Sequence, residues 1–83
     1  DKALAADGIG DHRAVARLLD EALALARTNK DRVGEGRVLL QRGANYAQTG
    51  QLDRAGNDWR QSRDIARMAG DPICEGNALN NLG

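Results

Sequence analysis

Few residues in this chain could take part in covalent or metal chemistry. His12 is the only histidine and Cys74 the only cysteine among 83 residues, and they lie far apart in the sequence. Because a catalytic or metal site needs several such groups together, we interpret His12 as a solvated helix-start residue and Cys74 as a small packing residue. Gly8-Ile9-Gly10 lacks the preceding strand and the Lys-Ser/Thr of a phosphate-binding loop, which makes it a turn. The sequence therefore predicts no enzyme activity, no metal and no cofactor.

Charge and composition argue against two further classes of partner. Twelve basic residues balance twelve acidic ones, and the signs are interspersed, so we expect no basic face for nucleic acid. Only Tyr46 and Trp59 are aromatic, which is too few for a base-stacking platform. No apolar run is long enough to cross a bilayer, so no membrane partner is expected. A single cysteine fits a reducing compartment and predicts a cytoplasmic location. Ten arginines against two lysines indicate a GC-rich, bacterial source.

The elements that must position any binding residues are expected to be helices. The chain is rich in alanine, leucine and arginine and poor in β-branched residues. Asp11, Asp31 and Asp71 are plausible N-caps, and Gly50 and Gly70 can end helices because glycine adopts a positive φ at little cost. The expected helices run from Asp11 to about Thr28–Lys30, from Asp31 to about Thr49, from Leu52 to Gly70, and from Pro72 onward.

Each of the first three helices carries an apolar or small-residue stripe that we expect to face the core. Two glycines in the second stripe cost roughly 1 kcal/mol each relative to alanine, so a neighbouring backbone should approach closely there. The stripes are Val15, Leu18, Leu19, Ala22, Leu25 and Ala26; Val33, Gly36, Leu39, Leu40, Gly43, Tyr46 and Ala47; and Leu52, Ala55, Trp59, Ser62, Ala66 and Ala69, widened by Ile65 and Met68.

The strongest signal is an internal repeat, seen when the chain is shifted by 40 residues so that position 31 falls on 71. The repeating unit is a helical hairpin, and successive hairpins should stack. We therefore expect an all-α α-solenoid in which residues 31–70 form one complete hairpin. Residues 1–30 would end the preceding repeat, and residues 71–83 would form the first helix of the next. The matched residues are Ala26, Arg27, Asp31, Glu35, Gly36, Leu39 and Gly43 with Ala66, Arg67, Asp71, Glu75, Gly76, Leu79 and Gly83.

These residues resemble tetratricopeptide repeats (TPR). The small and aromatic positions of that family correspond here to Gly43, Tyr46, Gly50, Ala55 and Trp59. Pro72 follows the second helix, as it often does in the family, and Asn81-Leu82-Gly83 resembles the Asn-Leu-Gly that opens a repeat. The period is longer than the usual ~34 residues, and is similar to that of kinesin light chains and Leu-Gly-Asn repeat proteins. The resemblance implies a TPR-like superhelix.

The sequence departs from the family pattern at two positions that affect packing. Arg42 stands where the family expects leucine, and its equivalent in the next copy is Leu82. Asn45 stands where alanine is common, so the packing around Tyr46 should either be looser or use a hydrogen bond.

The resemblance also implies where a partner would bind. In this family the first helix of each hairpin lines a concave groove, which here would include Leu40 and Ala44. Amides in such a groove can pair with the backbone of an extended peptide, and an arginine would favour a carboxylate. The polar candidates are Arg37, Gln41, Asn77, Asn80 and Asn81. Leu40 and Ala44 occupy two positions of the carboxylate clamp of some relatives, so that function is not expected here.

We interpret the chain as a protein- or peptide-binding scaffold segment. One alternative is a sensor or regulatory segment of a bacterial signalling protein or transcription regulator. Another is a self-association module. Terminal repeats normally have a polar outer face, whereas Leu79 and Leu82 are apolar. We therefore expect either a homo-oligomer formed through open repeat ends or docking of these ends onto neighbouring repeats of the parent chain.

Overall fold

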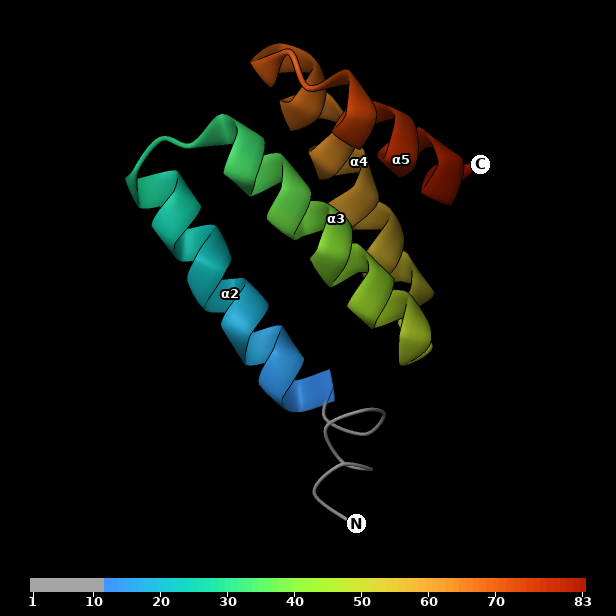
Figure 1. Cartoon of the computed structure of the whole chain (residues 1–83). Coiled ribbons are helices and arrows are strands. Elements are labelled where there is room, and N and C mark those ends of the chain that lie inside the picture. The colour runs from blue at the N-terminus through green and yellow to red at the C-terminus, as the bar shows by residue number, and fades with distance from the viewer. Residues whose placement is uncertain (1–11) are drawn as a thin grey trace, which may run out of the picture.

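The computed structural model describes residues 12–83, and these residues form four helices joined by tight turns (Figure 1). The helices are α2 (His12–Thr28), α3 (Arg32–Gln48), α4 (Leu52–Ala69) and α5 (Pro72–Leu82). There is no strand in this part of the chain. The predicted all-α class is confirmed, and the expected helix ends agree closely with the observed ones. The N-cap predicted at Asp11 and the turn predicted at Gly8-Ile9-Gly10 lie outside the described residues.

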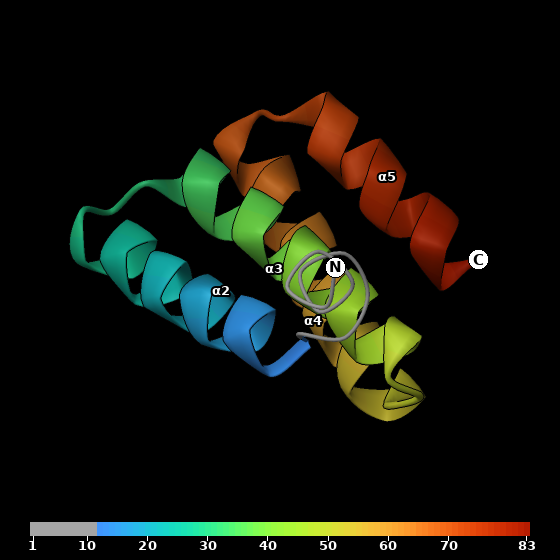
Figure 2. The same ribbon diagram turned by 60° about the horizontal axis from the view of Figure 1, so that its bottom comes forward.

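Each helix runs antiparallel to the next, so the chain folds back on itself at every turn (Figures 1 and 2). Packing follows the order of the chain: α2 packs on α3, α3 on α4 and α4 on α5, and α3 also touches α5. Both views place α2 and α5 on opposite sides of α3. Within residues 12–83, none of the helices combines the length and the apolar character that a membrane span requires.

The turns that precede α3 and α5 are built in the same way. Asp31 accepts a hydrogen bond from the backbone N–H of Gly34 at 3.0 Å, and Asp71 accepts one from Cys74 at 3.4 Å. Both aspartates thereby satisfy an amide that the first helical turn leaves without a backbone partner. The two predicted caps are confirmed.

An ion pair also recurs across both turns. Arg27 at the end of α2 lies 3.1 Å from Glu35 in the first turn of α3, and Arg67 at the end of α4 lies 2.9 Å from Glu75 in α5. In each pair the base sits at a helix C-terminus and the acid at a helix N-terminus, which is the favourable arrangement for the helix dipoles. The internal repeat therefore extends from residue identities to contacts.

Two glycines approach α4 from α3, and they do so in different ways. A β-carbon on Gly36 would lie 3.6 Å from the backbone carbonyl oxygen of Ser62 and from the backbone nitrogen of Ala66. This confirms the predicted close backbone approach. A β-carbon on Gly43 would instead lie 2.5 Å from Nε1 of Trp59, so the prediction of a backbone neighbour is wrong at that position. The Trp59 indole is held in place because it donates to the Leu40 carbonyl at 3.2 Å.

The stripe predicted for α2 is only partly buried. Leu23, which the prediction left out, is 3% exposed and Ala26 is 7% exposed, whereas Val15, Leu18 and Leu25 are 43%, 65% and 61% exposed. The reason is that α2 carries apolar residues on two faces, and α3 covers only one of them. Helical periodicity alone does not distinguish the two faces.

Three further residues predicted to face the core are exposed. Val33 is 40% exposed, Leu52 67% and Met68 76%. Leu52 is the first residue of α4, Met68 the last but one, and Val33 the second residue of α3. The apolar spacing continues to the ends of these helices, but the neighbouring helix does not cover those ends.

Replacing Gly43 with alanine should destabilise the fold by about 1–3 kcal/mol, because the added methyl group would overlap the Trp59 indole and displace it. Urea unfolding followed by circular dichroism measures this change. Gly56→Ala is the matched control within α4. Its β-carbon would meet only the Arg60 side chain, at 3.7 Å, so the better helix propensity of alanine should raise stability by up to about 1 kcal/mol. Equal effects of the two substitutions would contradict this packing.

Candidate functional site

The polar residues predicted to bind a partner lie on two neighbouring helices. Arg37 and Gln41 belong to α3, and three asparagines belong to α5; all five residues are exposed. The two helices are in contact, and we refer to these five exposed residues together as the amide face. Apart from Arg37, the side chains of its members make no hydrogen bond within residues 12–83. These members are Gln41, Asn77, Asn80 and Asn81.

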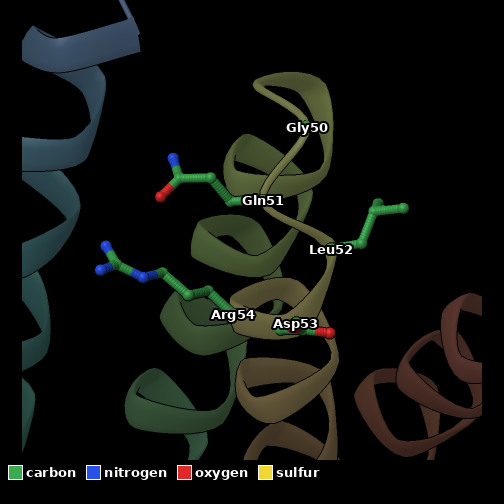
Figure 3. A pocket seen from close by; sticks show the side chains of 5 residues that line it. All are labelled: Gly50, Gln51, Leu52, Asp53 and Arg54. Carbon is green, nitrogen blue, oxygen red and sulfur yellow. The ribbon is translucent and has the colours of Figure 1, made fainter.

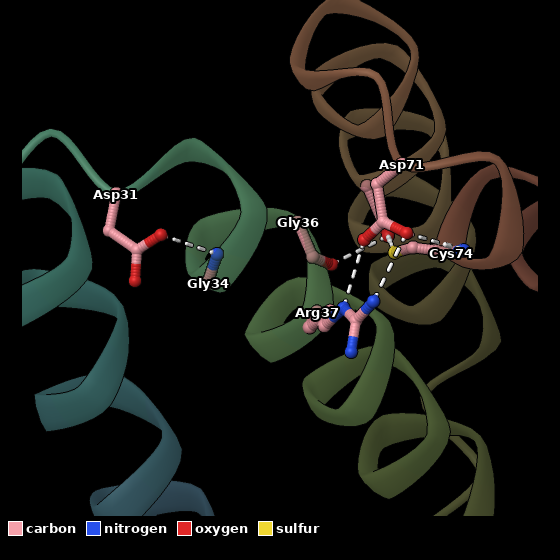
Figure 4. A network of polar contacts seen from close by, with 7 residues as sticks. Asp31, Gly34, Gly36, Arg37, Asp71 and Cys74 are labelled. Carbon is pink, nitrogen blue, oxygen red and sulfur yellow. Dashed lines mark hydrogen bonds and ion pairs between the residues drawn. The ribbon is translucent and has the colours of Figure 1, made fainter.

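Arg37 already binds a carboxylate of its own chain. Its Nε and Nη2 donate to the two carboxylate oxygens of Asp71 at 2.9 and 3.1 Å (Figure 4). This is a bidentate pair of the strong, charge-assisted kind. The Asp71 side chain is only 6% exposed and also caps α5. Arg37 therefore ties α3 to the start of α5, and a partner's carboxylate would have to displace Asp71.

The pairing shifts the ionisation of both groups. The hydrogen bond from Arg37 lowers the pKa of Asp71 below its ordinary value, helped by the Cys74 backbone N–H and opposed by burial. The same bond raises the pKa of Arg37. Asp71 therefore stays ionised in mildly acidic solution, and the link between the two helices persists there.

A buried polar contact continues the network beneath this pair. The Ser62 hydroxyl donates to the Gly36 carbonyl at 2.7 Å and lies 3.4 Å from Sγ of Cys74. Cys74 is 2% exposed, which confirms the prediction that it is a packing residue. Ser62 lies in α4 and Gly36 in α3, so this contact ties those two helices together next to the N-terminal end of α5.

Arg42 is the residue whose role the sequence analysis missed. Its Nε and Nη2 donate to Asp58 of α4 at 2.7 and 3.0 Å, and its Nη1 donates to Asp20 of α2 at 2.9 Å. The bonds to Asp58 outweigh the effect of burial and raise the pKa of Arg42. One guanidinium thus joins three helices. The sequence did contain a sign of this role. Asp58 lies on the same side of α4 as Ala55 and Ser62, which were predicted to face the core, and a charge buried there requires a partner.

His12 and Asn45 tie the start of α2 to the end of α3. Nδ1 of His12 lies 2.9 Å from Oδ1 of Asn45, and Nδ2 of Asn45 donates to the His12 carbonyl at 3.3 Å. Asn45 is 8% exposed and His12 is half-buried. The prediction that His12 is merely solvated is wrong, because Asn45 packs against it. Of the two alternatives for Asn45, the hydrogen bond is the one observed.

Two surface hollows lie at turns, and no member of the amide face lines either of them. One is lined by residues 50–54 at the turn between α3 and α4. Figure 3 shows the side chains of Gln51 and Arg54 pointing to one side of this turn and those of Leu52 and Asp53 to the other. The second hollow is lined by Arg27, Lys30, Arg32 and Glu35. Residues 12–83 contain no group of three His, Cys, Asp or Glu side chains that could hold a metal ion.

Comparison with known proteins gives no match. No protein-family model fits the sequence, and searches of curated proteins and of solved structures find no significant similarity.

Replacing Arg37 with glutamine should raise the pKa of Asp71 toward its ordinary value, because the main stabilising bond to the carboxylate is lost. An NMR pH titration of the aspartate carboxyl carbons measures this directly. The lowered pKa contributes stability above the unfolded-state pKa of about 3.9, and that contribution is lost as the pH falls through the lower folded-state value. The variant should therefore be less stable at neutral pH and lose less stability on acidification.

Arg67→Gln is the matched control for this experiment. It removes an arginine from an exposed pair with Glu75 across the same turn and leaves Arg37 in place. The pKa of Asp71 should not change in this variant. An Asp71 pKa that is insensitive to Arg37→Gln would show that the bidentate pair does not form in solution.

Proposed function

We propose that this chain is part of a TPR-like α-solenoid and binds a protein or peptide partner across its amide face, on α3 and α5. The observation that carries the proposal is a set of exposed amides, on two helices that touch, whose side chains make no hydrogen bond to any residue that the structure describes. Both helices are the first helix of a hairpin in the 40-residue repeat, and the second helices, α2 and α4, lie between or beside them.

The packing order supports a solenoid. Each helix packs mainly on its neighbours in the chain, and α3 also touches α5. The same cap and the same ion pair introduce both first helices. A repeated turn followed by a repeated helix is what stacks hairpins in register.

The chemistry of the amide face favours an extended peptide. A carboxamide offers both a donor and an acceptor, so it can match a peptide bond of the partner without regard to the partner's side chains. Within residues 12–83, the side chains of Gln41, Asn77 and Asn81 make no hydrogen bond, so their donors and acceptors are available to a partner. The charge of Arg37, in contrast, is compensated by Asp71. Recognition should therefore depend on the amides more than on charge.

A random-sequence peptide library displayed on phage tests this proposal with the whole 83-residue chain. Replacing Asn77 and Asn81 together with alanine should weaken the selected peptides roughly tenfold or more, which corresponds to about 1.4 kcal/mol. The unfolding midpoint should not fall, because both side chains are exposed.

The matched control replaces Asn29 and Gln61, two exposed amides outside the amide face, with alanine. Peptide affinity should be unchanged in that variant. The proposal fails if the library yields no binders, or if the selected peptides bind the Asn77 and Asn81 variant as tightly as the wild type.

A further inference from the structure

The turn before α3 and the turn before α5 have the same backbone. The amide of Asp31 donates to the last turn of α2 at 2.8 Å, and the amide of Asp71 donates to the last turn of α4 at 2.9 Å. The residue before the aspartate has a positive φ in both turns: it is Lys30 at 56° in the first and Gly70 at 72° in the second. Glycine adopts this conformation at the lowest cost. The lysine therefore makes the first turn less stable than a glycine would.

The first turn carries two positive charges that the second turn lacks. A shift of 40 residues places Lys30 on Gly70 and Arg32 on Pro72. Both Lys30 and Arg32 are exposed, and neither side chain forms a hydrogen bond or an ion pair within residues 12–83. The ion pair that the two turns share therefore does not use these two charges.

The two free charges line one of the surface hollows. Lys30 and Arg32 line it together with Arg27 and Glu35, and we call these four residues the basic hollow. Arg27 and Glu35 compensate each other, with 3.1 Å between Nε and Oε2. The Asp31 carboxylate is engaged with the Gly34 amide and is not among the lining residues. With three cations and one carboxylate, the lining of the hollow has an excess of positive charge.

The helices on either side of such a turn leave it open. The turn between α4 and α5 has α3 before it, and the side chains of its Arg67 and Glu75 are still 62% and 25% exposed. The turn between α2 and α3 has α4 and α5 after it, and the side chains of its Arg27 and Glu35 are 52% and 12% exposed. Neither the preceding helix nor the following ones therefore cover this part of the repeat.

We propose that the basic hollow binds a segment of a partner protein that carries two or more neighbouring carboxylates. Complementary charge selects this occupant, because Lys30 and Arg32 can each pair with one carboxylate. The Nη groups of Arg27 also donate to nothing within residues 12–83. A compact dianion such as phosphate would bring its whole charge close to Glu35, whereas the carboxylates of a peptide can bind the two free cations separately.

The lysine at a position suited to glycine supports a binding role. Residues that cost stability in the free protein are typical of sites where they contact a partner. None of the four residues of the basic hollow belongs to the amide face, so this site lies beyond the proposed function.

Titration of the 83-residue chain with a short oligoglutamate peptide, followed by NMR of the backbone amides, tests the proposal. The amides of residues 27–35 should shift and saturate. An oligoglutamine peptide of the same length should not shift them. The affinity should fall with added sodium chloride, because ion pairs at an exposed site are screened by salt.

Replacing Lys30 with glycine should weaken oligoglutamate binding roughly threefold, which is the loss expected for one exposed ion pair. The same change should raise the midpoint of urea unfolding, because glycine fits the positive φ better. Opposite effects on binding and stability distinguish a binding residue from a structural one. Adding Arg32→Gln should bring the loss of affinity to roughly tenfold. Arg67→Gln is the matched control, since it removes an exposed arginine from the equivalent ion pair, and it should not change the affinity.

The second turn allows the site to be transplanted. A β-carbon on Gly70 would meet nothing within 4 Å, so there is room for a lysine side chain. The variant that combines Gly70→Lys with Pro72→Arg should bind a second oligoglutamate peptide, and the amides around Asp71 should then shift as well.

Four results would overturn the proposal. Oligoglutamate that does not shift the amides of residues 27–35 would show that an acidic segment does not bind there. Unchanged affinity in the variant that combines Lys30→Gly with Arg32→Gln would place the binding elsewhere. A folded transplant variant that gains no second site would show that these cations do not make the site. Inorganic phosphate that displaces the peptide at equal ionic strength would show a general anion site.

The proposal and the proposed function fail independently. The variant with alanine at Asn77 and Asn81 should bind oligoglutamate as the wild type does. Peptides selected for the amide face should likewise bind the Lys30→Gly variant with unchanged affinity.

Discussion

The side chain of Asp58 is 5% exposed, and a carboxylate buried between helices needs a partner. Leaving such a charge unpaired costs several kcal/mol, whereas a pair replaced by well-packed apolar residues costs little. Arg42 donates two hydrogen bonds to Asp58 and a third to Asp20 of α2. Any sliding of α2 or α4 along α3 would break one of these bonds. The arginine therefore specifies the register of three helices more than it adds to the net stability.

Around this contact, the contacts at the turns are the same in both copies of the repeat, whereas the contact at the centre of the helices differs. The caps and the ion pairs at the turns recur in the second copy, and Gly36 recurs there as Gly76. The central contact is not repeated, because the 40-residue equivalents of Arg42 and Asp58 are Leu82 and Leu18.

The fold could be predicted from the sequence wherever its cause is local. Asp31 and Asp71 act on amides three residues away, so their role as caps is visible in the sequence. The burial of α2 could not be predicted in the same way, because Leu18 and Leu23 both belong to plausible apolar faces and only the position of α3 selects between them. The candidate site likewise could be predicted only where the cause is local. The exposure of Gln41 follows from its position on α3. The ion pair of Arg37 with Asp71 could not be predicted, because it forms only when α5 lies beside α3.

The claim that Arg42 and Asp58 act as one unit can be measured directly with a double-mutant cycle of urea unfolding. Arg42→Leu leaves a buried carboxylate without its main partner and should destabilise the fold by about 3 kcal/mol or more. Asp58→Leu should cost less, because Arg42 keeps Asp20 and some solvent. The double variant places leucine at both positions, as the sequence does at the equivalent Leu82 and Leu18, and should lie within about 1 kcal/mol of the wild type. A double variant whose loss equals the sum of the two single losses would contradict this account.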